Sequence, residues 1–227
     1  MSNPLIVALD LEAGEARSLV ARLGPAIDFY KVGLELFSAE GPGFVRELTG
    51  AGKQVFVDLK MYDIGETVKR ATRRIAELGA SLLTVHAHPQ VIRAARAGAE
   101  GTQLKILAVT VLTSFGQSDL EDLGVTGRTV AGQVEFLARK GAEAGADGFV
   151  CSPLEVARLR ALTGPDAILV TPGVRSPGAD LGDQKRVATP AEALAAGATY
   201  LVIGREITRA AEPVKAAEQL RASIGLA

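Results

Sequence analysis

Apolar residues recur along the chain in short, nearly continuous runs, each about as long as one β-strand. Runs of this kind are typical of strands that are buried on both faces, as in a parallel sheet covered by helices. The pattern predicts eight strands, at residues 5–9, 29–32, 55–59, 82–85, 106–112, 148–151, 168–170 and 200–203.

The stretches between most of these runs are rich in Ala, Leu, Glu and Arg, and their apolar positions repeat at helical spacing. They predict helices that include residues 12–23, 65–78, 90–97, 129–144, 154–162 and 191–195. Glycine follows several of them just before the next strand, at Gly79, Gly145 and Gly197, as is common where helices end.

This alternation of strands and helices predicts a parallel sheet covered by helices. Eight strands in a chain of this length fit a closed (β/α)8 (TIM) barrel, and we expect residues 1–227 to form one α/β catalytic domain of this kind. The alternative is an open, doubly wound sheet. Its Gly-x-Gly-x-x-Gly turn is missing after the first strand, where Asp10-Leu11-Glu12 stands instead.

The composition excludes several classes of protein. The 227 residues include 25 Lys and Arg against 26 Asp and Glu, so the net charge of −1 predicts no nucleic-acid or membrane partner. The single cysteine, Cys151, excludes an internal disulfide, and Cys and His are too few for a zinc cluster. Apolar runs stay shorter than the ~20 residues that span a bilayer, and the amino-terminal run is too short for a secretory signal. We therefore expect a cytoplasmic protein.

The third apolar run leads into the segment Asp58-Leu59-Lys60-Met61-Tyr62-Asp63. Because strand side chains alternate between faces, Asp58 and Lys60 are expected to point the same way, with Asp63 just past the strand end. Charges in such a setting cost free energy unless they are paired. Two carboxylates and an ammonium therefore predict an acid–base or charge-stabilising site.

Polar residues follow other predicted strands too, and in a barrel the carboxyl ends of the strands meet at one rim, where the chemistry takes place. These residues are Asp10, Thr113, Ser114, Arg175 and Arg205 after their strands and Lys31 within its strand, and Gly204 beside Arg205 allows close backbone approach. The loops after the last two strands often bind phosphate, and arginine presents a planar fork to phosphate oxygens. The loop 176–185, with Gln184 near its end, is long enough to close over a ligand.

Each of these residues also has a purely structural interpretation. Asp58 and Lys60 could form a structural ion pair, Asp10 could cap the first helix, and Arg205 could be a solvated residue at a helix start. A turn is the alternative for Thr113 and Ser114, and packing is the expected role of His86, His88 and Cys151.

Several motifs occur in a fixed order along nearly the whole chain. They are Leu9-Asp10, Tyr30-Lys31-Val32-Gly33, Asp58-x-Lys60-x-x-Asp63-Ile64, Leu112-Thr113-Ser114, Thr171-Pro172-Gly173-Val174-Arg175, Asp183-Gln184-Lys185-Arg186-Val187 with Thr189-Pro190, and Val202-Ile203-Gly204-Arg205. In this combination the chain resembles the orotidine 5′-phosphate decarboxylase family. The Asp-x-Lys-x-x-Asp core is shared with sister barrel enzymes, whereas the combination is far more specific.

The resemblance implies a lyase of de novo pyrimidine biosynthesis that converts orotidine 5′-monophosphate to UMP and CO2 without a metal or an organic cofactor. It implies that Lys60 donates the proton to pyrimidine C6, with Asp58 and Asp63 close to the departing carboxylate. Lys31 would link this charge network to the ribose.

The resemblance also implies the substrate contacts. Asp10 would bind ribose, Thr113 or Ser114 would lie near the pyrimidine, Gln184, Gly204 and Arg205 would hold the phosphate, and Arg175 would support that loop. Family members are homodimers with sites shared across the interface, so Asp63, Ile64 and Thr67 are expected to reach into the partner's site.

The chain departs from the family pattern at a few positions. Met61 and Tyr62 replace an aromatic residue and a histidine, Gly65 and Glu66 replace Pro and Asn, and Glu206 replaces a common Pro. The Gly-Glu pair is similar to that of sister enzymes such as hexulose-phosphate synthase, which use a magnesium-stabilised enediolate.

Two alternative functions follow. A metal-dependent sugar-phosphate aldolase or decarboxylase would need carboxylates arranged for magnesium, and the Arg175 and Gln184 segments argue against it. A non-catalytic, nucleotide-binding barrel would have no use for Lys31, Asp58, Lys60 and Asp63 together.

Overall fold

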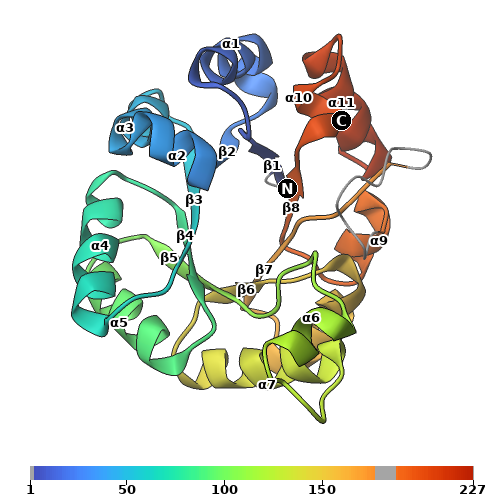
Figure 1. Ribbon diagram of the computed structural model, residues 1–227. Helices are drawn as coiled ribbons and strands as arrows, with labels where there is room; N and C mark the ends of the chain where they lie inside the picture. The colour runs from blue at the N-terminus through green and yellow to red at the C-terminus, as the bar shows by residue number, and fades with distance from the viewer. Residues whose placement is uncertain (1–2, 177–187, 227) are drawn as a thin grey trace.

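The computed structural model describes residues 3–176 and 188–226 of the chain. Its eight parallel strands form a closed barrel in chain order, with helices in a ring around them (Figure 1). The strands are β1 Leu5–Ala8, β2 Phe29–Gly33, β3 Gln54–Met61, β4 Leu82–His86, β5 Lys105–Val109, β6 Gly148–Val150, β7 Ile168–Thr171 and β8 Tyr200–Ile203. The barrel closes where β1 pairs with β8, for example Leu5 with Leu201. The predicted (β/α)8 fold is confirmed.

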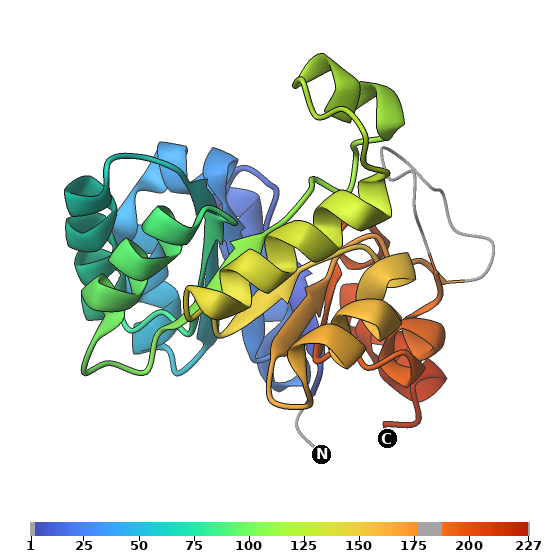
Figure 2. The same cartoon turned by 90° about the horizontal axis from the view of Figure 1, so that it is seen from below.

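The helices follow the strands in sequence, and most of them cover the outside of the barrel (Figure 1). They are α1 Ala13–Leu23, α2 Leu34–Glu40, α3 Pro42–Gly50, α4 Gly65–Glu77, α5 Pro89–Ala99, α6 Gln117–Asp122, α7 Val130–Glu143, α8 Val156–Thr163, α9 Pro190–Ala195, α10 Arg205–Thr208 and α11 Pro213–Ser223, with 3-10 turns η1 Gly24–Ala26 and η2 Pro153–Glu155. Gly79, Gly145 and Gly197 have positive φ, which confirms their predicted role at helix ends. Figure 2 shows α6 standing clear of the barrel, on the side opposite the amino terminus.

Several predicted strand boundaries differ from the structure by one or two residues, and the end of the fifth strand differs most. The run 106–112 leaves the sheet after Val109, three residues earlier than its apolar character predicts. The neighbouring strands explain this end, because Val109 pairs with His86 at the end of β4 and with Val150 at the end of β6. Beyond it the chain turns, and the Phe115 N–H donates to the Leu112 carbonyl (2.9 Å).

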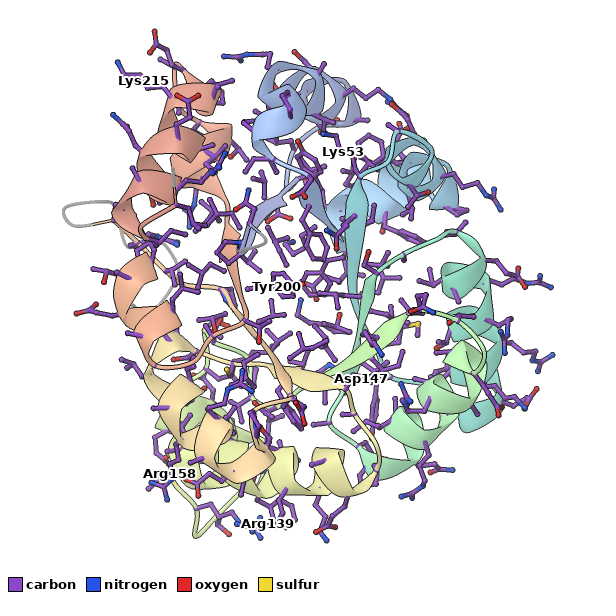
Figure 3. The ribbon with its side chains drawn as sticks, turned by 180° about the vertical axis from the view of Figure 1, so that it is seen from behind. Lys53, Arg139, Asp147, Arg158, Tyr200 and Lys215 are labelled. Carbon is purple, nitrogen blue, oxygen red and sulfur yellow. The ribbon has the colours of Figure 1, made fainter. Side chains whose placement is uncertain are left out.

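The alternation of side chains along the strands divides the apolar core into two layers. One layer packs between strands and helices, and the other fills the barrel and includes Phe29, Phe56 and Leu82. Toward one end of the barrel, the rings of Phe29 and Tyr200 meet edge-on at 5.3 Å, with Tyr200 inside the ring of strands (Figure 3). Two residues further along β2, β3 and β4, the same inward face carries polar residues, Lys31, Asp58 and Thr84. A polar layer therefore lies directly on the apolar filling of the barrel.

No helix among the described residues combines the length and the apolar character that crossing a bilayer requires.

Candidate active site

A cavity of about 490 Å³ opens at the carboxyl ends of the strands. Its wall includes eight of the residues singled out from the sequence: Asp10, Lys31, Asp58, Lys60, Thr113, Arg175, Gly204 and Arg205. They come from segments spread over nearly the whole chain, and only closure of the barrel brings them to one place. Val109, Val150 and Val202 supply apolar surface at its floor.

Four charged side chains form an alternating row along the wall of this cavity. Lys60 Nζ lies 2.8 Å from Asp58 Oδ2, and Lys31 Nζ lies 3.9 Å from the same oxygen. Lys31 Nζ also donates to Asp10 Oδ1 at 2.8 Å. The row therefore runs Lys60, Asp58, Lys31, Asp10, and each charge has an opposite charge beside it.

The row is buried in the middle and open at its ends. The side chains of Lys31 and Asp58 are 11% and 13% exposed, against 31% for Lys60 and 56% for Asp10. Buried charges need partners because desolvation penalises them, which explains the double pairing of Asp58. Lys60, at one end, has a charged nitrogen that a ligand in the cavity can reach.

The predicted side-by-side arrangement of Asp58 and Lys60 is correct, but a regular strand does not produce it. Val57 pairs with Leu83 and Met61 pairs with Val85, so four steps on β3 match two steps on β4. The extra residues form a bulge, a feature that often re-aims side chains beside active sites. Within the bulge, Lys60 has a φ of +48°. Among the described residues, Lys60 is the only one other than glycine that has a positive φ.

Sequence reasoning missed Thr84, which faces this bulge from β4. Its hydroxyl donates to Asp58 Oδ1 (2.7 Å) and accepts the backbone N–H of Lys60 (3.0 Å). The only signal in the sequence is a hydroxyl residue in an otherwise apolar run, on the inward-facing position after Leu82.

Basic groups gather on the wall formed by the last two strands. Arg175 follows β7, and its Nη1 donates to the Val174 carbonyl (2.8 Å), while its backbone N–H donates to Ala188 (3.0 Å). Arg205 begins α10 directly after Gly204, so it is both an exposed residue at a helix start and part of the cavity wall. Sequence reasoning missed Arg209, four residues further on, whose spacing from Arg205 places it on the same side.

Two of the structural alternatives can be decided. Asp10 does not cap the first helix, because Glu12 occupies the N-cap position and the Asp10 carboxylate binds Lys31 instead. Thr113 and Ser114 do form a turn, closed by the bond from Phe115 to Leu112. Thr113 also lines the cavity, whereas Ser114 is exposed and does not.

The residues expected to serve a partner's site lie outside the cavity of their own chain. Asp63, Ile64 and Thr67 are exposed at the end of β3 and the start of α4. The Asp63 carboxylate accepts the Ile64 N–H at 2.6 Å, and Ile64 is 77% exposed. Gln184 lies outside the described residues, as does most of the loop 176–185.

The half-buried His86 and the buried Cys151 have surroundings that fit packing roles, whereas His88 is exposed. Cys151 is fully buried. The half-buried His86 meets the Tyr62 ring edge-on at 5.8 Å, and His88 meets the same ring at 6.0 Å. Burial lowers the pKa of His86 below its ordinary value, and the nearby charge of Lys60 lowers it further. Within residues 3–176 and 188–226, His, Cys, Asp and Glu form no group of three or more that could hold a metal ion.

The chain is similar to known proteins over nearly its whole length. Residues 3–220 match the model of the "Orotidine 5'-phosphate decarboxylase / HUMPS family". Proteins named orotidine 5′-phosphate decarboxylase from Rhodopseudomonas palustris (strain BisB5) and Afipia carboxidovorans are each 51% identical to it. These alignments cover 98% and 100% of this chain and 95% and 97% of the relatives.

The chain is also similar to solved structures over nearly its whole length. The crystal structure of orotidine 5′-phosphate decarboxylase from Lactobacillus acidophilus superposes with a TM-score of 0.87 at 38% identity, covering 98% of this chain and 99% of that one. An uncharacterized conserved protein from Geobacillus kaustophilus superposes with a TM-score of 0.85 at 34% identity, covering 97% and 100%.

Proposed function

The chain belongs to the orotidine 5′-phosphate decarboxylase / HUMPS family, and from this membership we infer that it is a decarboxylase of pyrimidine biosynthesis. It converts orotidine 5′-monophosphate to UMP and CO2 and is therefore a carbon–carbon lyase. The observation that carries this conclusion is the row Lys60, Asp58, Lys31, Asp10 along one wall of a cavity, together with a basic wall after β7 and β8. A substrate with a carboxylated ring at one end and a phosphate at the other matches both walls.

Lys60 is the proposed proton donor. When the bond between C6 and the carboxylate breaks, CO2 leaves and the electron pair stays on C6. The ammonium of Lys60 faces that charge and gives it a proton, and the amine later regains a proton from solvent. A cation that is already in position stabilises the developing charge without reorganisation, and such stabilisation is usually the largest single contribution to catalysis.

Asp58 has two roles in this proposal. Its Oδ2 holds the Lys60 ammonium at 2.8 Å, so that the proton donor stays in one place. Its negative charge also lies on the side where the substrate carboxylate departs, together with Asp63 of a partner subunit. Lys31 balances Asp58 from the other side and, with Asp10, binds the ribose hydroxyls.

The remaining contacts grip the substrate at a distance from the reacting bond. Arg205 and Gly204 hold the phosphate together with Gln184, and Arg175 supports the β7 loop through its bond to Val174. Thr113, or Ser114 after a movement of its turn, contacts the pyrimidine. Binding energy gained at the phosphate can then hold the pyrimidine against Lys60.

The working unit in this proposal is a cytoplasmic homodimer. Its support is the exposure of Asp63, Ile64 and Thr67 beside the exposed ring of Tyr62. Large apolar side chains at a site rim are typical of protein contacts. The proposal includes no metal or organic cofactor and no nucleic-acid or membrane partner.

Purified protein mixed with orotidine 5′-monophosphate tests the proposal, because ultraviolet absorbance follows loss of the pyrimidine carboxylate. We expect full conversion to UMP, at the same rate with excess EDTA. The family description also covers HUMPS enzymes. A rate that EDTA abolishes and magnesium restores would support a metal-dependent alternative, and a protein that binds UMP but turns nothing over would support a non-catalytic barrel.

A further inference from the structure

Thr84 joins the two residues at the centre of the proposed site. Its side chain is fully buried in β4, so it can act only through its neighbours. Its hydroxyl donates to Asp58 Oδ1 at 2.7 Å and accepts the Lys60 N–H at 3.0 Å. A threonine hydroxyl has one hydrogen to donate, and here Asp58 takes it.

The bond to Asp58 decides which carboxylate oxygen faces the lysines. With Oδ1 bound to Thr84, Oδ2 is the atom that lies 2.8 Å from Lys60 and 3.9 Å from Lys31. The torsion of a carboxylate about its last bond is broad, so a buried partner is needed to hold one orientation. Thr84 therefore fixes the anion that in turn fixes the proton donor.

The bond to the Lys60 backbone supports the bulge. At this point β3 leaves the regular ladder, and Lys60 adopts the left-handed conformation with a φ of +48°. That conformation is costly for a side chain with a Cβ and persists only where the surroundings enforce it. The Thr84 hydroxyl gives the Lys60 N–H a partner in place of the strand bond that the bulge removes.

We propose that Thr84 is a positioning residue for the decarboxylation, because its hydroxyl sets both the orientation of Asp58 and the backbone turn that aims Lys60 into the cavity. The inference rests on the proposed function of this site. It differs from a packing role, because a methyl group of the same size in place of the hydroxyl fills the space but makes neither bond.

Three variants of the full-length protein separate these roles. Thr84→Val removes the hydroxyl and keeps the size, Thr84→Ala removes it without crowding, and Thr84→Ser retains it. The matched control is Thr72→Val on α4, where the same atoms change at a fully buried hydroxyl without a hydrogen-bond partner. Each variant is assayed for kcat and KM across a pH series, with binding of UMP as a separate readout.

We expect Thr84→Val and Thr84→Ala to lower kcat by about 100-fold, the order of loss that a displacement of about 1 Å in a catalytic group causes. KM and UMP affinity should change much less, because the phosphate contacts are untouched. Thr84→Ser should recover most of the kcat, and Thr72→Val should match the wild type.

Wild-type kcat in folded Thr84→Val or Thr84→Ala would overturn the proposal, as would a Thr84→Ser variant no better than Thr84→Val. If only the valine variant fails to fold, comparison of kcat between the alanine and serine variants still tests the positioning role of Thr84. A wild-type protein without decarboxylase activity would instead overturn the proposed function. In that case a crystal structure of Thr84→Ala still tests the positioning role, which requires that Lys60 leave its left-handed conformation.

Discussion

Lys60 Nζ lies 2.8 Å from Asp58 Oδ2, although only one residue separates the two along β3. In a regular strand, side chains two positions apart are nearly parallel, with their bases about 6–7 Å apart. The bulge and the left-handed backbone of Lys60 bring the two charged groups together. The pair is thus held by backbone geometry that costs free energy, which is common at functional sites.

Lys60→Ala should abolish turnover and leave the barrel folded. The variant loses the proton donor and the cation that stabilises the charge on C6, while the apolar core is unchanged. The steady-state rate of decarboxylation should fall by at least ~10⁴-fold, which is the order of the combined contributions of a general acid and of electrostatic stabilisation to catalysis. Lys69→Ala, at an exposed position of α4, is the control and should match the wild type. Near-normal turnover by Lys60→Ala would remove Lys60 from the mechanism.

Arg205→Ala should lower the rate of decarboxylation of the nucleotide orotidine 5′-monophosphate but should not change that of the nucleoside orotidine. A lost charge-assisted bond to phosphate lowers kcat/KM for orotidine 5′-monophosphate by about 10–100-fold. Orotidine lacks the phosphate, so its much slower reaction should be unchanged. Arg139→Ala, on the outer surface of α7 (Figure 3), is the control. An equal loss with both substrates would mean that Arg205 does not contact phosphate.

Asp63 and Lys60 should belong to opposite subunits of one active site. Asp63→Ala and Lys60→Ala are each expected to be inactive, because each lacks one charge in every site. Mixing and re-pairing the two should restore about a quarter of the wild-type activity, since half of the dimers are then mixed and each holds one intact site. The measurement is activity before and after dissociation and reassociation.

Re-pairing each variant with itself is the control for this experiment and should restore nothing. Sedimentation should show a dimer for both variants and for the wild type. A mixture that stays inactive although mixed dimers form would place Asp63 in the site of its own chain.

His86 should make the fold sensitive to mild acid. Its pKa in the folded protein is lowered from 6.5, mainly by burial and then by Lys60, so the unfolded chain takes up a proton at a higher pH than the folded one. The stability that depends on neutral His86 is complete above pH 6.5 and is lost as the pH falls through the lowered pKa. Denaturant unfolding at about pH 7.5 and about pH 5.5 measures this loss.

His86→Gln removes the titrating ring and should therefore reduce the loss of unfolding free energy between the two pH values. The other histidine of the chain, the exposed His88, provides the control, because His88→Gln leaves the buried ring in place. An acid loss in His86→Gln as large as that of the wild type would show that other groups cause it.

The sequence alone determined the barrel and most of the cavity wall. Runs of apolar residues and helical spacing are local patterns, and they predicted all eight strands. Because the carboxyl ends of the strands of a barrel meet at one rim, the polar residues at the ends of those runs were expected to lie close together. These patterns predicted that Asp10, Lys31, Asp58, Lys60 and Arg205 lie together, as they do in the cavity wall.

Only the tertiary structure decided how these residues face one another. The length of β5, the bulge in β3 and the role of Thr84 all depend on which residue of a neighbouring strand lies opposite, and that register involves residues far away in sequence. The outward position of Asp63, Ile64 and Thr67 has the same origin, since the chain turns from β3 into α4 there. Local patterns follow from the preferences of each segment, whereas strand pairing follows from closure of the whole barrel, and the bulge in that pairing aims Lys60 into the cavity.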